Sequence, residues 1–321
     1  MARVLVSARV PGDAVARLRA AGHEVTSRDV DSPMPREELL AAVAGVDALV
    51  AMLVDRVDAE LLDAAGPGLR VVANVAVGYD NVDLSACRER GVVVTNTPGV
   101  LTDATADLAM ALVLMTTRSL GAAERRVRTG EPWRWSLTGH LGTGLRGKTL
   151  GIVGPGAIGI ATARRALAFG MEVVLTGRSE PDPAVVEALG ARVVDLAELL
   201  ACADVVALHC PLTPATHHLV GAEQLRAMKR TAHLVNTSRG PVVDEAALVA
   251  ALEAGEVAGA GLDVFEDEPR VHPGLLARDD VVLLPHVGSA TVETRTAMAD
   301  LAVANVVAAL GGDPAVTPVG G

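Results

Sequence analysis

The chain has 321 residues, of which 50% are hydrophobic and 21% charged, and its formal net charge is -11. This length favours about two globular domains, and the composition excludes disorder over most of the chain. The acidic balance argues against nucleic acid as a partner, and no apolar window reaches the roughly 18 residues that a membrane span requires. Residues 1–10 lack the apolar core of a signal peptide, so we expect a cytoplasmic protein.

The first third of the chain alternates apolar strands with helical segments. We expect strands at 4–7, 47–53, 71–75 and 92–95, and helices at 13–21 and 59–65. This alternation predicts a parallel sheet covered by helices on both faces. An apolar helix over 101–120 is then long enough to cross between domains.

The rest of the chain repeats the alternation. We expect strands at 149–153, 172–175, 191–194, 204–208, 233–236, 259–264 and 281–284, followed by a helix at 291–310 that could return to the first domain. The first domain is then discontinuous. We predict one domain from 1–99 and 286–321, and a second from 100–285 that includes the crossover helix.

A glycine-rich turn follows the strand at 149–153. Gly154, Gly156 and Gly159 have G-x-G-x-x-G spacing, and a helical pattern follows them. In this context Gly154 allows a tight turn, Gly156 admits a pyrophosphate and Gly159 packs the helix on its strand. The anion would lie at the helix N-terminus, where Ala157 and Ile158 stand. The motif therefore predicts a dinucleotide site.

The next strand ends without the carboxylate that usually binds the ribose 2′-hydroxyl of NAD. Arg178 and Ser179 stand there instead, and an Arg beside a hydroxyl can hold a 2′-phosphate. This favours NADP(H), with NAD possible. The alternative is that Arg178 is an ordinary solvated loop residue.

Three further stretches follow predicted strands of the second domain, at 236–240, 261–269 and 284–291. Ligands of doubly wound folds bind at the carboxyl ends of the strands. We therefore expect these stretches to converge on one crevice.

Together with the motifs at 52–53, 77–83, 100–109 and 210–216, these stretches show a resemblance that covers nearly the whole chain. The sequence resembles the D-isomer-specific 2-hydroxyacid dehydrogenases, and among them the glyoxylate/hydroxypyruvate reductases. The resemblance implies an α/β fold of two doubly wound parallel-sheet domains, in which a Rossmann cofactor domain is inserted in a flavodoxin-like substrate domain.

The resemblance also implies catalytic roles. His286 would supply the proton, and the carboxylate of Glu268 would favour its imidazolium form and raise its pKa. Arg239 would bind the substrate carboxylate and the charge growing on the carbonyl oxygen. The backbone N–H groups of Val77 and Gly78 would meet the same carboxylate, with Leu53 in the pocket wall.

Further cofactor contacts are implied by the same resemblance. They are Thr105, Cys210, Pro211, Thr216, Thr237, Asp263 and Gly288. For Asp263 two roles stay open, because it could hold the cofactor amide or position Arg239.

Other residues are ambiguous or carry no function. His217 and His218 have no third ligand nearby in the sequence, and Cys87, Cys202 and Cys210 lack metal-ligand spacing, so we expect no metal and reduced thiols. The resemblance implies a homodimer. Trp133 and Trp135 could reach the active site, that of a neighbouring subunit included, or pack in a core or interface.

The predicted activity is the NADPH-dependent reduction of a small 2-keto acid such as glyoxylate or hydroxypyruvate. Two alternatives remain. Similar proteins oxidise phosphite, but they carry a Lys where this chain has Val77. C-terminal-binding-protein corepressors share the fold and the three catalytic residues but act as cofactor sensors, and the sequence has no evident extension for their partner peptides.

Overall fold

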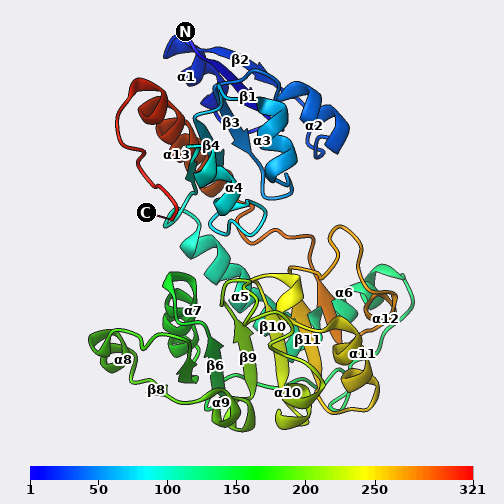
Figure 1. Cartoon of the computed structure of the whole chain (residues 1–321). Helices are drawn as coiled ribbons and strands as arrows, with labels where there is room; N and C mark the ends of the chain where they lie inside the picture. The colour runs from blue at the N-terminus through cyan, green and yellow to red at the C-terminus, as the bar shows by residue number, and fades with distance from the viewer. Residues whose placement is uncertain (321) are drawn as a thin grey trace. The chain divides into compact units, whose positions relative to one another are not determined.

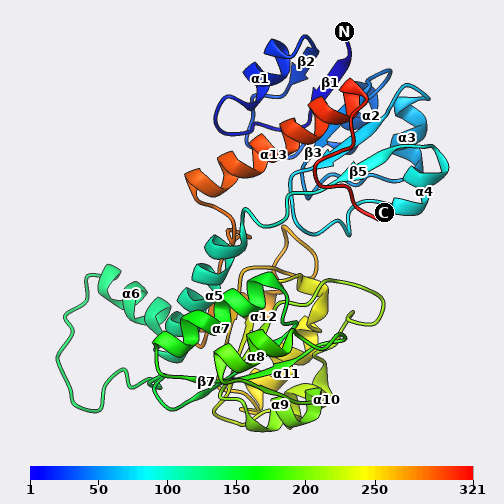
Figure 2. The ribbon, with the colours of Figure 1, turned by 90° about the vertical axis from the view of Figure 1, so that its left-hand side faces the viewer.

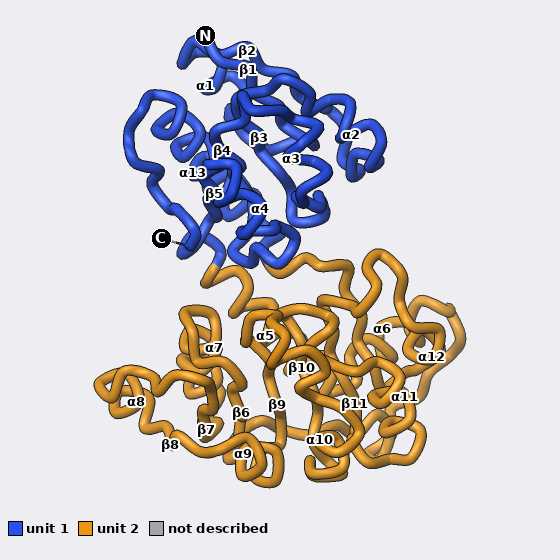
Figure 3. Tube along the Cα trace, viewed as in Figure 1, with its two compact units in different colours: residues 1–101, 289–321 blue, residues 102–288 orange. Residues whose placement is uncertain are grey.

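The computed structural model describes residues 1–320, which form two compact units (Figure 3). Unit 1 contains residues 1–101 and the chain from Ser289 onward, and unit 2 contains residues 102–288. These limits lie two and three residues beyond the boundaries expected at 99 and 286. His286 therefore belongs to unit 2. Its N–H donates to the carbonyl of Asp263 in the same unit (2.8 Å).

Unit 1 is built on a five-stranded parallel sheet in the order β2-β1-β3-β4-β5. This is the flavodoxin-like order that the sequence led us to expect. The strands are β1 (Arg3–Val6), β2 (Glu24–Ser27), β3 (Ala48–Ala51), β4 (Val71–Asn74) and β5 (Val93–Thr95). The helices are α1 (Ala14–Ala20), α2 (Arg36–Ala42), α3 (Ala59–Ala65), α4 (Leu84–Glu89) and α13 (Val292–Gly311).

Each face of this sheet carries a hydrophobic core. Successive side chains of a strand point to opposite faces, so one strand contributes to both cores. In β1, Val4 and Val6 pack with α1 and α13, whereas Leu5 packs with the core under α2, α3 and α4. Helix α13 lies along the unit 1 sheet in Figures 1 and 2, so the C-terminal segment completes a core begun at the N-terminus.

Unit 2 is built on a seven-stranded parallel sheet in the order β12-β11-β10-β9-β6-β7-β8. The six strands from β11 to β8 have the Rossmann order that the predicted fold class implies, and β12 is one further strand at the edge beside β11. The strands are β6 (Thr149–Val153), β7 (Glu172–Thr176), β8 (Arg192–Val193), β9 (Val205–Leu208), β10 (His233–Asn236), β11 (Gly259–Leu262) and β12 (Val281–Leu283).

The helices of unit 2 cover the two faces of this sheet. They are α5 (Thr102–Thr117), α6 (Leu120–Arg128), α7 (Ala157–Ala168), α8 (Pro183–Leu189), α9 (Leu196–Cys202), α10 (Ala222–Ala227), α11 (Glu245–Glu253) and α12 (Pro273–Leu276), with a 3-10 turn η1 (Gly240–Val242). Side chains of α5, α7 and α8 pack in one core, and those of α9, α10 and α11 pack in the other.

The crossover segment is two helices and not the single helix expected over 101–120. Helix α5 ends at Thr117, whose hydroxyl donates to the carbonyl of Val113 and whose own carbonyl accepts from the N–H of Thr143. Ser119 then adopts a left-handed conformation (φ 47°), and α6 leaves at 71° to α5. Among the described residues no single helix meets the length and hydropathy of a membrane span; only this bent pair does so in combination.

Candidate active site

The glycine turn between β6 and α7 has the shape that a dinucleotide pyrophosphate requires. Gly154 has φ 94°, and a Cβ there would lie 2.5 Å from the backbone nitrogen of Cys210. A Cβ on Gly159 would lie 2.5 Å from the carbonyl oxygen of Gly154, whereas one on Gly156 would meet nothing within 4 Å. Gly156 also caps α7 without a side chain, so the N–H groups at Ala157 and Ile158 can receive an anion.

Arg178 and Ser179 lie at the same edge of the sheet as this turn. Strand β7 pairs with β6 so that Thr176 stands opposite Val153, and the carbonyl of Thr176 accepts from the N–H of Gly154 (2.8 Å). Arg178 follows two residues later and is exposed. The structure thus leaves its guanidinium accessible beside the glycine turn.

The turn after β10 is shaped by Asn236. Its amide group donates to the carbonyl of Arg239 (2.9 Å), and its carbonyl oxygen accepts from the N–H and the hydroxyl of Ser238. The Arg239 guanidinium donates in turn to the carbonyl of Ser238 (2.9 Å). The sequence prediction named Arg239 but missed Asn236, although an Asn at a strand end often stabilises a turn through its side chain.

This turn packs directly against the segment that follows β11. A Cβ on Gly240 would overlap the backbone of Phe265, so only glycine permits the approach. The approach brings the positive charge of Arg239 close enough to help lower the pKa of Glu268. Arg239 and Glu268 are therefore parts of one electrostatic environment.

Glu268 and His286 form a hydrogen-bonded pair. The Nδ1 atom of His286 lies 2.8 Å from Oε2 of Glu268, and the N–H of Phe265 donates to the other carboxylate oxygen (3.0 Å). Burial raises the pKa of Glu268, but the hydrogen bond and charge of His286, the Phe265 N–H and the charge of Arg239 outweigh it, so the pKa lies below its usual value. Glu268 is accordingly a carboxylate at neutral pH, and His286 donates Nδ1–H to it.

Asp263 fixes the backbone that carries His286. Its carboxylate accepts from the N–H groups of Val287 (2.7 Å) and Gly288 (2.8 Å), and His286 itself has φ 52°. Burial raises the pKa of Asp263 despite these N–H groups. Gly288 also leaves room for Thr105, whose Cγ2 atom would lie 3.4 Å from a Cβ there. Asp263, Thr105 and Gly288 are thus adjacent, and Asp263 acts on the loop that carries the imidazole.

The loop after β9 lies at the same edge of the sheet, because β9 pairs in parallel with β6 and β10. The hydroxyl of Thr216 donates to the carbonyl of Pro211 (2.7 Å) and accepts from the N–H of Thr213, so it fixes the loop. Burial raises the pKa of the Cys210 thiol to about 11, which leaves it protonated at neutral pH. Thr237 lies 3.4 Å from Nδ1 of His209, a ring whose pKa burial lowers to about 4.

In unit 1, the residues expected to bind substrate lie on loops held by asparagines. Asn96 donates to the carbonyl of Val77 (2.8 Å) and Asn74 to that of Gly78 (2.9 Å). Asn81 donates to the carbonyl of Met52 (3.3 Å), next to Leu53. The sequence prediction gave these asparagines no role, and two of them, Asn96 and Asn81, hold carbonyls 19 and 29 residues away.

Comparison with known proteins finds relatives over most of the chain. The model of the D-isomer specific 2-hydroxyacid dehydrogenase, NAD binding domain, matches residues 110–288. A glyoxylate reductase from Thermococcus litoralis is 47% identical over 311 residues, which cover 95% of this chain and 93% of the relative. A solved structure from Thermus thermophilus is 48% identical, with a TM-score of 0.93, over 99% of this chain and 100% of its own.

A second solved structure contains bound ligands. It is an NADPH-dependent glyoxylate/hydroxypyruvate reductase from Sinorhizobium meliloti in complex with NADP and malonate. It is 38% identical to this chain, with a TM-score of 0.85, and the match covers 99% of this chain and 96% of the other.

Proposed function

The chain belongs to the D-isomer specific 2-hydroxyacid dehydrogenases, which are NAD(P)-dependent oxidoreductases, and from this premise we propose that it reduces glyoxylate, and also hydroxypyruvate, with NADPH. The observation that carries the proposal is the 2.8 Å contact between His286 and Glu268, beside the turn of Arg239. The similarity to a glyoxylate reductase from Thermococcus litoralis and to a glyoxylate/hydroxypyruvate reductase from Sinorhizobium meliloti supports these substrates.

The residues divide the work of reducing a 2-keto acid. Bound NADPH would supply the hydride, and its pyrophosphate fits the space beside Gly156. Arg239 would bind the substrate carboxylate and stabilise negative charge on the carbonyl oxygen. His286 would hold on Nε2 the proton that this oxygen takes up, since Nδ1 is committed to Glu268.

The substrate contacts in unit 1 belong to the same proposal. We assign the backbone N–H groups of Val77 and Gly78 to the substrate carboxylate, and Leu53 to the wall beside the substrate side chain. The carbonyl of Val77, held by Asn96, shares its peptide with the N–H of Gly78. The carbonyl of Ala76 accepts from the N–H of Thr97 (2.8 Å) and shares its peptide with the N–H of Val77, so each of the two N–H groups lies on the opposite edge of a fixed peptide.

A panel of 2-keto acids, each assayed with NADPH and with NADH, tests the activity. We expect the highest kcat/KM with glyoxylate or hydroxypyruvate, and loss of most turnover in Arg239→Ala with NADPH affinity nearly unchanged. Arg239→Lys keeps the charge but loses the planar pair of donors, so it should remain well below the wild type. Tight NADPH binding without turnover of any 2-keto acid would instead support a cofactor sensor.

Arg178 and Ser179 support the preference for NADPH, because an exposed guanidinium beside the glycine turn can bind a 2′-phosphate. In Arg178→Ala, we expect the ratio of kcat/KM for NADPH to that for NADH to fall about tenfold or more, through KM for NADPH. Arg230→Ala removes another exposed arginine and should leave the ratio unchanged. An equal loss with both cofactors would remove the assignment.

We also propose that the protein is a homodimer. The segment after α6 extends from unit 2 in Figure 2, and it exposes Trp133 (62%), Trp135 (79%), Leu137 (78%) and Leu141 (74%). Several large apolar side chains exposed within one short segment favour burial against another chain. Sedimentation should show a dimer, and the double variant Trp135→Asp, Leu141→Asp should weaken it.

We also propose a cytoplasmic location, and cell fractionation tests it.

A further inference from the structure

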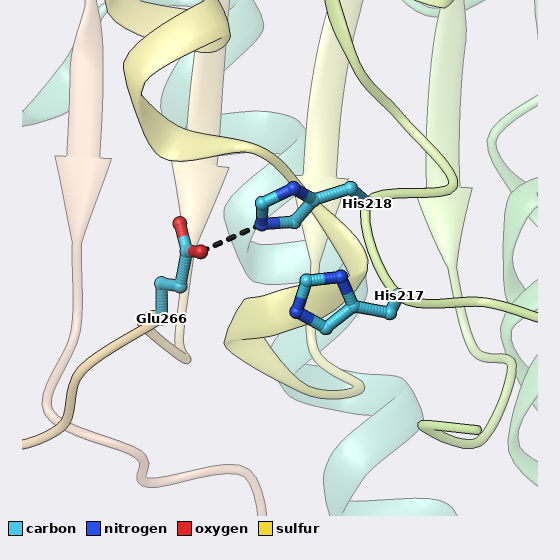
Figure 4. Close-up of side chains that lie close together, drawn as sticks. All are labelled: His217, His218 and Glu266. Atoms are coloured by element: carbon cyan, nitrogen blue, oxygen red, sulfur yellow. Dashed lines mark hydrogen bonds and ion pairs between the residues drawn. The ribbon is translucent and has the colours of Figure 1, made fainter. Parts of the chain in front are cut away.

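A second cluster of chemically active side chains lies on unit 2, apart from the catalytic pair. It consists of His217 and His218, from the loop after β9, and Glu266, from the loop after β11 (Figure 4). One ligand atom of each lies within 4.8 Å of those of the other two. The Nε2 atom of His218 is 2.6 Å from Oε1 of Glu266, and the two imidazole rings stack with centroids 4.1 Å apart.

Two further acidic residues, Asp244 and Glu245, lie beside this cluster. Asp244 places an oxygen 4.0 Å from Nδ1 of His218, on the side of the ring opposite Glu266, and its other oxygen accepts from the N–H of Ala247. The second carboxylate oxygen of Glu266 accepts from the N–H of Glu245 (3.3 Å), whose side chain accepts from the N–H of Glu266 (2.7 Å). The backbone N–H of Glu245 thus fixes the Glu266 carboxylate, and Asp244 places negative charge near the second ring nitrogen of His218.

The backbone of His218 is also held in an uncommon conformation. It has φ 51°, and its N–H donates to the carbonyl of Pro241 (2.8 Å). Such conformations cost free energy and persist where neighbouring contacts impose them, often at functional sites. Here the conformation presents the ring to Glu266, while His217 remains exposed beside it (Figure 4).

We propose that His217, His218 and Glu266 bind one zinc ion. Two imidazole nitrogens and one carboxylate oxygen are a donor set that Zn²⁺ accepts, with water in the remaining position of a half-exposed site. Mg²⁺ and Ca²⁺ require more oxygen ligands than the cluster offers. On binding, the proton between His218 and Glu266 passes to water, and both atoms become ligands. The zinc ion joins the loop that carries Thr216 to the loop that carries Glu268.

Calorimetry of the chelator-treated full chain without a histidine tag, titrated with ZnCl₂, tests this site. We expect one Zn²⁺ per chain and a higher melting temperature with zinc. Affinity should fall about tenfold or more in both His217→Ala and Glu266→Gln. His140→Ala, which removes another exposed histidine, should bind zinc as the wild type does. Co²⁺ in place of zinc should give the visible absorption bands of tetrahedral coordination, and these should disappear in the same two variants.

The catalytic histidine provides a second control. His286→Ala should retain the zinc stoichiometry and the cobalt bands if the ion lies where we propose. Zinc lost in His286→Ala but kept in His217→Ala would place the ion at the catalytic pair and overturn the proposal. Absence of stoichiometric binding in the wild type would leave the His218–Glu266 contact as an ion pair alone and would also overturn it. Both results are independent of reductase activity.

Discussion

The imidazole of His286 and the carboxylate of Glu268 are 2.8 Å apart, although 18 residues separate them in the chain. The loop after β11 holds both partners: the N–H of Phe265 donates to the Glu268 carboxylate, and the carbonyl of Asp263 accepts from the N–H of His286. The imidazole ring cannot turn without breaking its own hydrogen bond to Glu268. This fixes which nitrogen faces the carboxylate and leaves Nε2 for the role that we propose toward the substrate.

Replacing either member of this pair should lower turnover without loss of cofactor binding. His286→Ala removes the proton donor that we propose, and a positioned general acid contributes about 10²–10⁴-fold, so kcat should fall by that factor. Glu268→Gln keeps an oxygen acceptor but removes the charge, so a smaller loss, about 10–100-fold, is expected. Steady-state rates with glyoxylate and NADPH fluorescence titrations measure the two effects.

Glu187→Gln is the matched control for Glu268→Gln, since Glu187 is exposed on α8. It should have wild-type kcat and wild-type NADPH affinity. A Glu268→Gln enzyme with the same kcat as this control would show that the carboxylate does not position His286.

Asp263 should contribute more to stability than a surface carboxylate. It is 1% exposed and accepts two backbone N–H groups, from Val287 and Gly288. Asp263→Ala leaves both N–H groups buried without this acceptor, which should lower the free energy of unfolding by about 2–4 kcal/mol. Asp263→Asn retains one oxygen and should lose roughly half as much. Urea denaturation measures both, and equal stability of Asp263→Ala and the wild type would contradict this role.

The pH dependence of stability should include a contribution from Asp204. Burial raises its pKa, but the N–H of Thr149 (2.9 Å) and the ammonium groups of Lys229 (3.1 Å) and Lys148 outweigh this, so the pKa lies below its usual value. A carboxylate whose pKa is lowered by folding stabilises the protein above its unfolded pKa, and this contribution is lost as pH falls through the folded pKa.

Asp204→Asn should therefore lower the free energy of unfolding by about 1 kcal/mol at neutral pH. The difference from the wild type should shrink once the pH falls below 3.8, the ordinary value for Asp. Denaturation midpoints over a pH series measure it. Asp279→Asn, which removes an exposed partner of Arg125, should change stability little at any pH. A deficit in Asp204→Asn that grows as pH falls would contradict the assignment.

The sequence predicts most of the strands because both faces of parallel sheets are buried, so each strand is a short apolar run. Strand β2 departs from this rule: it lies at a sheet edge, and its residues from Glu24 to Ser27 alternate between exposed and half-buried. The single helix expected over 101–120 fails for a local reason, the left-handed Ser119. The sequence does change before this residue, since residues 116–119 are Thr-Thr-Arg-Ser, and the prediction extended the helix through this polar stretch.

The candidate site shows a similar division. Residues at strand ends, such as Arg239 and His286, can be predicted because the topology brings strand ends to one edge. Contacts between loops cannot be read in this way. Asn81 holds the carbonyl of Met52, and Glu266 contacts His218 across 48 residues. No local pattern links such partners, because their approach depends on the packing of two separate loops.

The glycine turn offers a test that separates cofactor binding from folding. A methyl group at Gly156 meets nothing within 4 Å, and the backbone there (φ −76°) suits any residue, so Gly156→Ala should fold with an unchanged melting temperature. The methyl group would occupy the space we assign to the pyrophosphate, so NADPH affinity should fall about tenfold or more. Gly154→Ala instead forces a Cβ to within 2.5 Å of the Cys210 backbone at φ 94°, and should destabilise the fold itself. Thermal melts and NADPH titrations of the two variants decide the matter: a Gly156→Ala protein that binds NADPH like the wild type would show that the anion does not lie at the start of α7.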